Sequence, residues 1–414
     1  SYTWNNLDKK ANGKNIKYTV EEITKLDDYT VSYETSDNGK LLIKNTYNKL
    51  PKEVTIVKEY TETTTTKVKK PVDVVFILDT SESMVDNKIT VNGKQVTRAQ
   101  AMVDATNTAI STILNTTNAD GTSVGNRVGV VAFSSTWSGT SNRAHANTLL
   151  TLGTYTPNRD GKYLIKDGST LSTSANNNVR YFQGATYTQA GIKQAETLFT
   201  ETTEERTPVI ILLTDGEPSF AYSDYDNISV TTSRDNLSGN GSSSTAYNDG
   251  ELGAPVVLSA AYYKDVIDDR YTNGTARMYT VGFGISNTNN FAKAVLDPSV
   301  MDDWTYSQKN YGRSGQIYED LTEQNNLTKE QYEYADDSFV GEDLDLTSIL
   351  NEVIDAAGEP EDKSETVTYK TTEEVGLAVI QTGKIELTAL DSDGKFVITV
   401  DGTEVVGSLS DAYD

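Results

Sequence analysis

Four short, almost purely apolar runs in the middle of the chain constrain its fold most strongly. They cover residues 72–78, 128–133, 209–213 and 278–283. Runs of this length without polar alternation are typical of strands buried on both faces of a parallel sheet. Apolar residues at helical spacing lie between or after them, around residues 102–114, 192–199, 256–266 and 344–354. This alternation predicts a doubly wound (Rossmann-like) α/β sheet with right-handed crossovers.

The segments on either side of this region have a different pattern. Apolar and polar residues alternate there, as in half-exposed antiparallel strands. The expected strands are residues 16–20, 29–33, 42–47, 53–60, 366–369, 384–387 and 396–400, with turns at 37–39 and 391–394. We therefore divide the chain into residues 1–50, 51–71, 72–357 and 358–414.

Long polar inserts interrupt the α/β region at residues 134–183, 217–253 and 286–342. Loops of this length in a compact domain are usually functional or disordered, and both readings stay open here.

Composition limits the chemistry that the chain can perform. The 36 basic residues are outnumbered by 60 acidic ones, and the net charge of −24 argues against a nucleic-acid partner. The absence of cysteine excludes zinc–thiolate sites, and the single histidine, His145, excludes a two-histidine metal site. Oxygen ligands remain, which suit Mg²⁺, or Mn²⁺ or Ca²⁺. No apolar run approaches the roughly 20 residues that span a bilayer, so we expect no membrane insertion in this fragment.

Oxygen-bearing side chains follow two of the apolar runs. Asp79, Ser81 and Ser83 come directly after the first run, and Asp215 follows the third. Thr186 opens the helix that leads to the third run. Because ligand sites in open α/β sheets lie beyond the carboxyl ends of the strands, we expect these side chains to converge on one ion.

The pattern Asp79-x-Ser81-x-Ser83, followed by Thr186 in a Gly-x-Thr-x-Thr setting and by Asp215 at a strand end, resembles the metal-ion-dependent adhesion site of von Willebrand factor A domains. The resemblance covers about residues 72–357. It implies that Ser81, Ser83 and in some states Thr186 bind the ion directly, while Asp79 and Asp215 act mainly through water. It also implies that a partner carboxylate fills a vacant position on the ion, without catalysis.

Residues 1–48 resemble the second half of a Cna-B-type domain, an immunoglobulin-like β-sandwich of Gram-positive surface proteins, through residues 2–7, 13–22 and 42–47. Many such domains carry a Lys–Asn isopeptide bond. By position, Asn45 would be the acceptor and Glu22 the proton shuttle, while the donor lysine belongs to a strand that this chain lacks. An ordinary strand-end Asn45 is the alternative.

Residues 53–60 resemble the opening strand of a second such module, with Lys58 at the donor position. We hypothesise that Lys58 bonds an Asn or Asp beyond residue 414; an ordinary surface lysine is the alternative. An A domain inserted between β-sandwich segments resembles the architecture of Gram-positive pilus tip adhesins.

The resemblance implies a non-enzymatic, extracellular protein, anchored to the cell wall or at a pilus tip, that binds a host matrix or cell-surface protein. The alternative is a pilus stalk or assembly component, whose metal is structural or binds other pilin subunits. An ATPase-linked enzyme is disfavoured, because the chain lacks a Gly-x-x-x-x-Gly-Lys-Ser/Thr phosphate loop.

Overall fold

The computed structural model divides the chain into two compact units, residues 67–361 and residues 1–66 with 362–414. It describes all residues except 1–2, 25–26, 28, 37–39, 48–53, 92, 136–142, 176–177, 242–248, 273, 287, 311–314, 343, 358–359, 376–394, 401–402 and 409–414. The predicted turns at 37–39 and 391–394 and the predicted strand at 384–387 lie outside the described residues.

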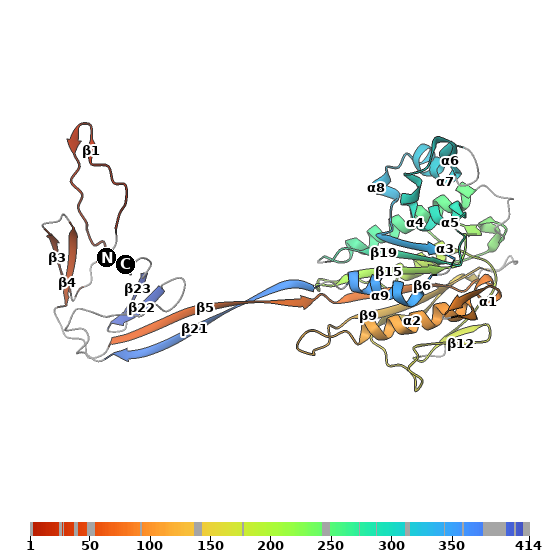
Figure 1. The fold of residues 1–414 in the computed structure, drawn as a ribbon, viewed down its shortest axis with the longest axis horizontal. Coiled ribbons are helices and arrows are strands. Elements are labelled where there is room, and N and C mark those ends of the chain that lie inside the picture. The colour runs from red at the N-terminus through yellow and green to blue at the C-terminus, as the bar shows by residue number, and fades with distance from the viewer. Residues whose placement is uncertain are drawn as a thin grey trace. The chain divides into compact units, whose positions relative to one another are not determined.

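A six-stranded sheet forms the centre of the larger unit (Figure 1). Its order is β11 (Ala146–Gly153), β9 (Arg127–Phe133), β6 (Val72–Asp79), β15 (Thr207–Thr214), β19 (Arg277–Phe283) and β20 (Asp337–Gly341). All neighbours are parallel except β11, which is antiparallel to β9. The four predicted runs are the four central strands, and every residue of β6 and β15 is buried.

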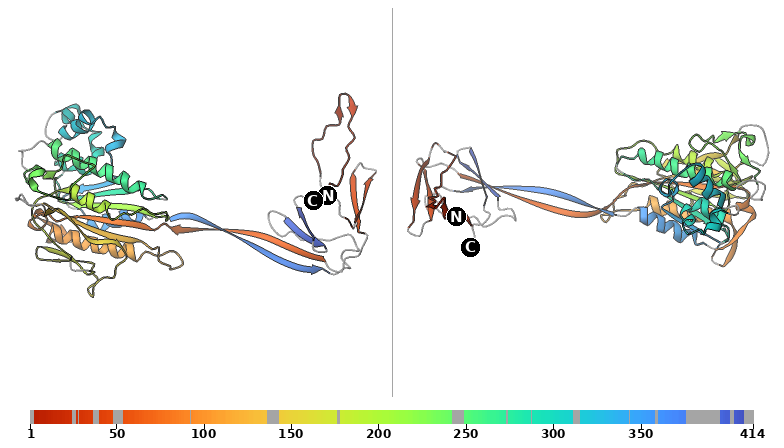
Figure 2. Two further views of the ribbon diagram at one scale, coloured as in Figure 1. Left: turned by 180° about the vertical axis from the view of Figure 1, so that it is seen from behind. Right: turned by 90° about the horizontal axis from the view of Figure 1, so that it is seen from above.

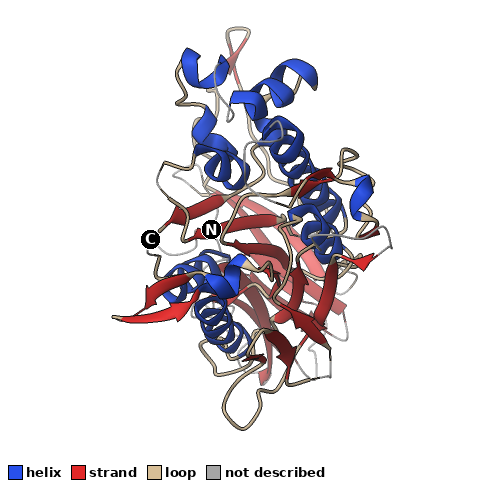
Figure 3. Cartoon of the chain, turned by 90° about the vertical axis from the view of Figure 1, so that its right-hand side faces the viewer, coloured by secondary structure: helices blue, strands red, loops and turns tan. Residues whose placement is uncertain are grey.

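Helices cover both faces of this sheet (Figure 3). One face packs against α2 (Arg98–Leu114) and α9 (Leu346–Ala357). The other packs against α3 (Thr188–Glu196), α4 (Asp249–Asp269) and α5 (Asn290–Leu296). Successive residues of β6 alternate between the two cores, because side chains of a strand point to opposite faces. The predicted doubly wound α/β fold is confirmed.

The close approach of α3 to the sheet depends on Gly191. A Cβ at this position would lie 2.7 Å from side-chain atoms of Ile77 and of Phe133. Any larger residue would push the helix away from the sheet, and α3 carries the loop of Thr186 at its start.

Two strands of the central sheet lie in segments that the sequence analysis interpreted as inserts. β11 belongs to the segment 134–183, and β20 to the segment 286–342. Both are edge strands, so they have no long apolar run: β11 is partly exposed and β20 begins at an exposed aspartate. The interpretation of these stretches as wholly inserted polar loops was therefore wrong.

The described remainder of the long inserts is also rich in short elements. The first carries the ribbon β12 (Leu164–Asp167), β13 (Thr170–Thr173) and β14 (Val179–Tyr181). Two small pairings join β10 (Arg143–Ala144) to β17 (Thr231–Thr232) and β16 (Phe220–Ala221) to β18 (Ser238–Gly239). Short helical segments follow: η1 (Arg234–Asn236), η2 (Pro298–Met301), α6 (Tyr306–Asn310), α7 (Gly315–Glu319), the π-helix Asp320–Gln324 and α8 (Lys329–Tyr332).

A short helix and a small hairpin separate β6 from α2. The helix is α1 (Ser83–Asp86), and the hairpin consists of β7 (Lys88–Val91) and β8 (Lys94–Thr97). Its last residue, Thr97, caps α2 by accepting a hydrogen bond from the backbone N–H of Gln100. The hairpin therefore fixes where α2 begins, and so where Arg98 lies.

The smaller unit is entirely β in its described part. It contains the pairs β1 (Lys10–Ala11) with β2 (Lys14–Asn15) and β3 (Tyr29–Thr35) with β4 (Leu41–Tyr47). A four-stranded sheet has the order β21 (Pro360–Val375), β5 (Val54–Lys69), β22 (Lys395–Val400) and β23 (Thr403–Ser408). The long strands β5 and β21 run side by side (Figure 2).

One predicted strand of this unit was wrong. Residues 16–20 are not a strand, although the short strand β2 ends just before them. Ile16 donates one backbone hydrogen bond to Lys9, but alternation alone makes no strand without a neighbouring backbone to pair with. The predicted strands at 29–33, 42–47, 366–369 and 396–400 are confirmed, as is 53–60 in its described part.

Among the described helices, none combines the length and the apolar character needed to cross a membrane.

Candidate metal centre

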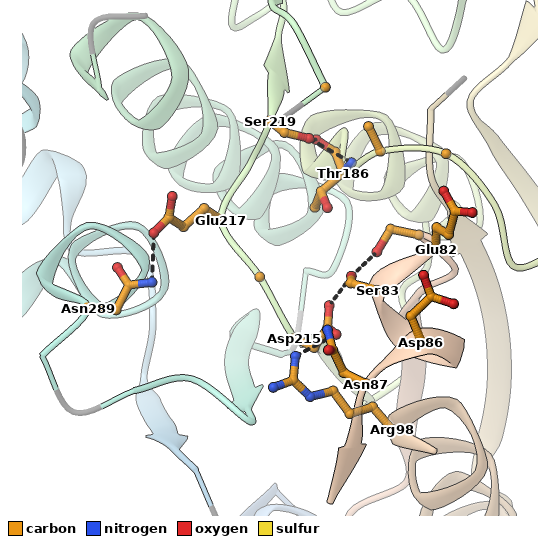
Figure 4. Close-up of a pocket in the computed structure, with 15 residues that line it drawn as sticks. Glu82, Ser83, Asp86, Asn87, Arg98, Thr186, Asp215, Glu217, Ser219 and Asn289 are labelled. Carbon is orange, nitrogen blue, oxygen red and sulfur yellow. Dashed lines mark hydrogen bonds and ion pairs between the residues drawn. The ribbon is translucent and has the colours of Figure 1, made fainter. Parts of the chain in front are cut away.

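A pocket of about 470 Å³ lies at the carboxyl ends of β6 and β15 (Figure 4). β6 sits between β9 and β15. The next strands of the sheet along the chain, β9 and β11, lie on one side of β6, and the later strands β15, β19 and β20 lie on its other side. Such a switch point is where open α/β sheets bind ligands. The pocket is lined by Ser81, Glu82, Ser83, Asp86, Asn87, Arg98, Gly184, Ala185, Thr186, Asp215, Gly216, Glu217, Ser219, Gly241 and Asn289.

A chain of hydrogen bonds connects four of the five predicted metal-site residues. The backbone N–H of Ser81 donates to Asp79 Oδ1 at 2.7 Å, which closes the loop after β6. The hydroxyl oxygens of Ser81 and Ser83 are 3.0 Å apart, and the Ser83 hydroxyl donates to Asp215 Oδ1 at 2.8 Å. Thr186, the fifth residue, lines the same pocket. The structure thus brings all five together from three separate segments.

The loop that carries Thr186 is held by backbone contacts. Gly184 adopts a φ of +72°, which favours glycine, and its carbonyl accepts a hydrogen bond from Glu82 N at 2.9 Å. The backbone N–H of Thr186 donates to the Ser219 hydroxyl at 2.9 Å. These bonds fix the Thr186 loop against the loops that follow β6 and β15.

Two buried carboxylates make the pocket floor electrostatically unfavourable without a cation. Burial and the neighbouring Asp215 raise the pKa of Asp79 to about 7, against hydrogen bonds from Thr214 and Ser81. Burial likewise raises the pKa of Asp215, although Arg98 and Ser83 oppose this. A charge removed from water needs a counter-charge or a proton, so a cation at this point relieves a real cost.

The donor set fits a hard divalent cation. Neighbouring oxygen ligands of octahedral Mg²⁺, each about 2.1 Å from the ion, lie roughly 3 Å apart, which is the spacing of the Ser81 and Ser83 hydroxyls. Within the described part of the chain, no three His, Cys, Asp or Glu side chains gather as a metal site. The fit therefore depends on hydroxyls as well as carboxylates.

Arg98 is a residue of this pocket that the sequence analysis missed. Its Nη1 donates to Asp215 Oδ2 at 2.9 Å, and its Nη2 donates to the carbonyl of Gly284 at 2.7 Å. The contact with Asp215 joins residues 117 positions apart, so no local motif reveals it. The available signal was a basic residue in the first turn of a helix, where the helix dipole disfavours positive charge.

Arg180 of β14 is the second residue that was missed. Its guanidinium donates to the hydroxyl of Ser134 at 2.6 Å, to the side-chain oxygen of Asn147 at 2.5 Å and to the carbonyl of His145 at 2.9 Å. Burial lowers the pKa of Arg180 to about 10, although the attraction of Asp79 opposes this shift. The ribbon therefore places a second half-buried cation near the loop of the proposed metal site.

The structure also brings together two of the residues considered for isopeptide chemistry. The Asn45 side-chain amide donates to Glu22 Oε2 at 2.7 Å, and the backbone N–H of Glu22 donates to the Tyr33 hydroxyl at 3.0 Å. Asn45 is exposed and Glu22 is half-buried. Lys58 pairs with Phe396 through the backbone, and its side chain lies outside what the structure describes.

Comparison with known families identifies both parts of the chain. Residues 74–217 match the family model of the von Willebrand factor type A domain, which includes all five residues of the proposed metal site. The chain contains a von Willebrand factor type A domain. Residues 1–46 match the model of the Cna protein B-type domain. The predicted A domain and Cna-B-type segment are thus confirmed.

Individual relatives resemble parts of the chain. A collagen adhesin of Staphylococcus aureus is 47% identical over 47 residues, which are 11% of this chain and 4% of that protein. A structure of the pilus adhesin SpaC from Lactobacillus rhamnosus GG has 19% identity and a TM-score of 0.40, covering 80% of this chain and 34% of that one. The manganese-loaded TRAP protein of Plasmodium vivax has 10% identity and a TM-score of 0.32, covering 86% and 95%. The chain thus spans only a small part of the collagen adhesin and about a third of that SpaC chain.

Proposed function

We propose that this chain is the ligand-binding part of an adhesin on a Gram-positive cell surface or pilus tip, and that its A domain binds a host matrix or cell-surface protein through a divalent cation. The observation that carries this proposal is the pair of hydroxyls, Ser81 and Ser83, joined to the buried Asp215 at the floor of an open pocket. The names of the relatives, a collagen adhesin and a pilus adhesin, support the same class of function.

The residues of the A domain have distinct parts in this proposal. Ser81, Ser83 and Thr186 would hold Mg²⁺, or Mn²⁺ or Ca²⁺, while Asp79 and Asp215 would act mainly through water. The bound ion would supply a Lewis-acidic position that accepts a carboxylate of the ligand. The Asp79 carboxylate orients Ser81 by accepting a hydrogen bond from the backbone N–H of Ser81. It also accepts a hydrogen bond from the Thr214 hydroxyl at 2.7 Å.

The ligands that we propose are neutral hydroxyls, and this choice favours binding over catalysis. Neutral ligands leave much of the ion's positive charge uncompensated, so an incoming carboxylate is attracted. We therefore expect reversible binding without turnover.

A solid-phase assay tests this proposal. The chain is applied to collagen, fibronectin, laminin and fibrinogen in Mg²⁺ and in EDTA, and Asp79→Ala is compared with Asp167→Ala, an exposed control. Binding should require Mg²⁺ and be lost in Asp79→Ala alone. Binding that EDTA leaves unchanged contradicts the metal bridge, and binding to pilin subunits only would favour the stalk or assembly role.

The contact between Glu22 and Asn45 supports a second, separate role. We propose that they are the acceptor half of an isopeptide site. A neutral lysine amine from another strand would attack the side-chain carbonyl carbon of Asn45, the bond from that carbon to the amide nitrogen would break, and Glu22 would carry the proton from the amine to this nitrogen, which leaves as ammonia. We further propose that Lys58 is the donor of such a bond to a residue beyond 414.

A further inference from the structure

Arg98 occupies an unusual position for an arginine at the start of a helix. Its side chain is 16% exposed, and that of its partner Asp215 is fully buried. The helix dipole does not favour it there, and its Nε finds no acceptor among the described residues. The contact with Asp215 in the pocket, together with the Gly284 carbonyl, is therefore what holds the guanidinium in place.

The formal charges at the pocket floor depend on Arg98. Asp79 and Asp215, when ionised, together with Arg98 leave one negative charge. A divalent cation turns this into one positive charge. Without Arg98, the same cation would produce a neutral site with little attraction for an anion.

We propose that Arg98 is a built-in counter-charge, which weakens the hold of the A domain on its divalent cation and makes the loaded pocket a receptor for carboxylate anions. This inference rests on the proposed metal-dependent binding and assigns a positioning and electrostatic role to a residue outside the metal-binding pattern. It predicts two opposite effects: removing the charge of Arg98 should strengthen cation binding and weaken anion binding.

Other charges near the pocket do not replace this role. Arg180 is half-buried on the Asp79 side, and its guanidinium donates hydrogen bonds to Ser134, Asn147 and His145. Glu82 and Asp86 are exposed, so water screens them. Among the basic residues of the described chain, Arg98 lines the pocket and contacts one of the two floor carboxylates directly.

Calorimetric titration with Mg²⁺ at pH 8 tests the predicted effect on cation binding. Arg98→Gln keeps hydrogen-bond donors but removes the charge, and we expect its Mg²⁺ Kd to fall roughly tenfold. Arg159→Gln makes the same change in net charge at an exposed position outside the pocket, and its Kd should match that of the unmodified chain.

Acetate binding to the Mn²⁺-loaded chain, measured by proton relaxation of acetate, tests the predicted effect on anion binding. Arg98→Gln should raise the acetate Kd severalfold, and Arg159→Gln should not. If Arg98→Gln weakens both Mg²⁺ and acetate, or changes neither, the counter-charge role is wrong and Arg98 only supports the fold.

A second variant separates charge from geometry. Arg98→Lys keeps the charge but loses the two-pronged contact, so its Mg²⁺ Kd should stay within about threefold of the original. Tightening equal to that of Arg98→Gln would contradict the inference.

The melting temperature of the metal-free protein tests the role of Arg98 even if the proposed metal-dependent function is wrong. In EDTA at pH 8, Arg98→Gln should melt at a lower temperature than Arg98→Lys, because the buried Asp215 loses its ion-pair partner. If the unmodified chain binds no Mg²⁺, the proposed function fails, and this comparison still decides the role of Arg98: equal melting temperatures overturn it.

Discussion

Strand β6 carries two fully buried aspartates, one near each end, and their pKa values are shifted in opposite directions. Asp79 at the pocket has a pKa raised to about 7 by burial and by Asp215. Burial also acts on Asp73, but hydrogen bonds from Arg127, Arg206 and Tyr271 outweigh it and hold the pKa of Asp73 below its ordinary 3.8. The charge of Asp73 is thus compensated by its hydrogen-bond donors within the fold. The charge of Asp79 is not, and a bound cation would stabilise it.

The stability of the metal-free chain should depend on pH through Asp79. Its folded pKa is above the ordinary value of 3.8, so its stabilising contribution is present below about pH 4 and is lost as pH rises through about 7. The melting temperature in EDTA should fall between pH 5 and pH 8, and less so in Asp79→Asn. Added Mg²⁺ should restore more stability at pH 8 than at pH 5. An equal fall in Asp79→Asn would show that other groups are responsible.

Replacing Asp73 should damage the fold without touching the pocket. Its carboxylate accepts hydrogen bonds from Arg127 at 2.8 and 2.5 Å and from the Tyr271 hydroxyl at 2.7 Å, and it pairs with Arg206 at 2.6 Å. Asp73→Asn leaves the buried Arg206 and the half-buried Arg127 without this carboxylate, and should lower the free energy of unfolding by about 3–5 kcal/mol in urea titrations. Asp167→Asn, at an exposed position, should change it by less than about 0.5 kcal/mol. A small effect of Asp73→Asn would mean that water solvates the arginines.

At the scale of elements, the ribbon β12–β14 is an insert that supports the proposed metal site. Arg180 of β14 reaches Thr80 in the metal loop at 3.3 Å and Ser134 after β9 at 2.6 Å. The backbone N–H of Gln183 also donates to the carbonyl of Thr80 at 2.9 Å. The insert therefore braces the loop that follows β6.

Arg180→Met should loosen this brace. The substitution leaves the carbonyls of Ala144 and His145 without this donor, and should cost roughly 2–4 kcal/mol of unfolding free energy. Hydrogen exchange should rise first at residues 179–183, and Arg159→Met should leave it unchanged. Exchange that rises evenly over the whole A domain would contradict a local role.

The proposed Lys58 bond is a covalent prediction about strand β5. In a longer form of this protein, condensation with an Asn or Asp should reduce the intact mass by about 17–18 Da, the mass of ammonia or water. Because a bond at Asn45 would reduce the mass independently, Lys58→Ala should show one such loss fewer than the unmodified protein. A full-length protein with its unreduced mass would contradict the prediction.

At the scale of the whole molecule, the A domain has its own hydrophobic cores. The buried residues of both cores lie between Val72 and Ile354, inside the unit of residues 67–361. The chain enters this domain at the start of β6, whereas the pocket lies at the end of that strand. The pocket therefore lies at the edge of the sheet away from the point where the chain enters the domain.

The excised fragment 67–361 should fold alone, because the described residues of both cores lie inside it. We expect a cooperative thermal transition and an Mg²⁺ Kd within about twofold of that of the full chain. Calorimetry of both proteins measures this directly. An unfolded fragment, or a Kd changed by more than about tenfold, would show that the β segments contribute to the A domain.

The sequence by itself determined the centre of the A domain. Strands buried on both faces must be apolar throughout, so 72–78 and its three counterparts could be read directly, and the oxygens of Asp79, Ser81, Ser83 and Asp215 follow them along the chain. Only the tertiary structure decided what lies around this centre. Edge strands such as β20 need no apolar run, and Arg98 meets Asp215 across 117 positions of sequence. Local patterns record burial and turns, whereas contacts between distant charges exist only after folding.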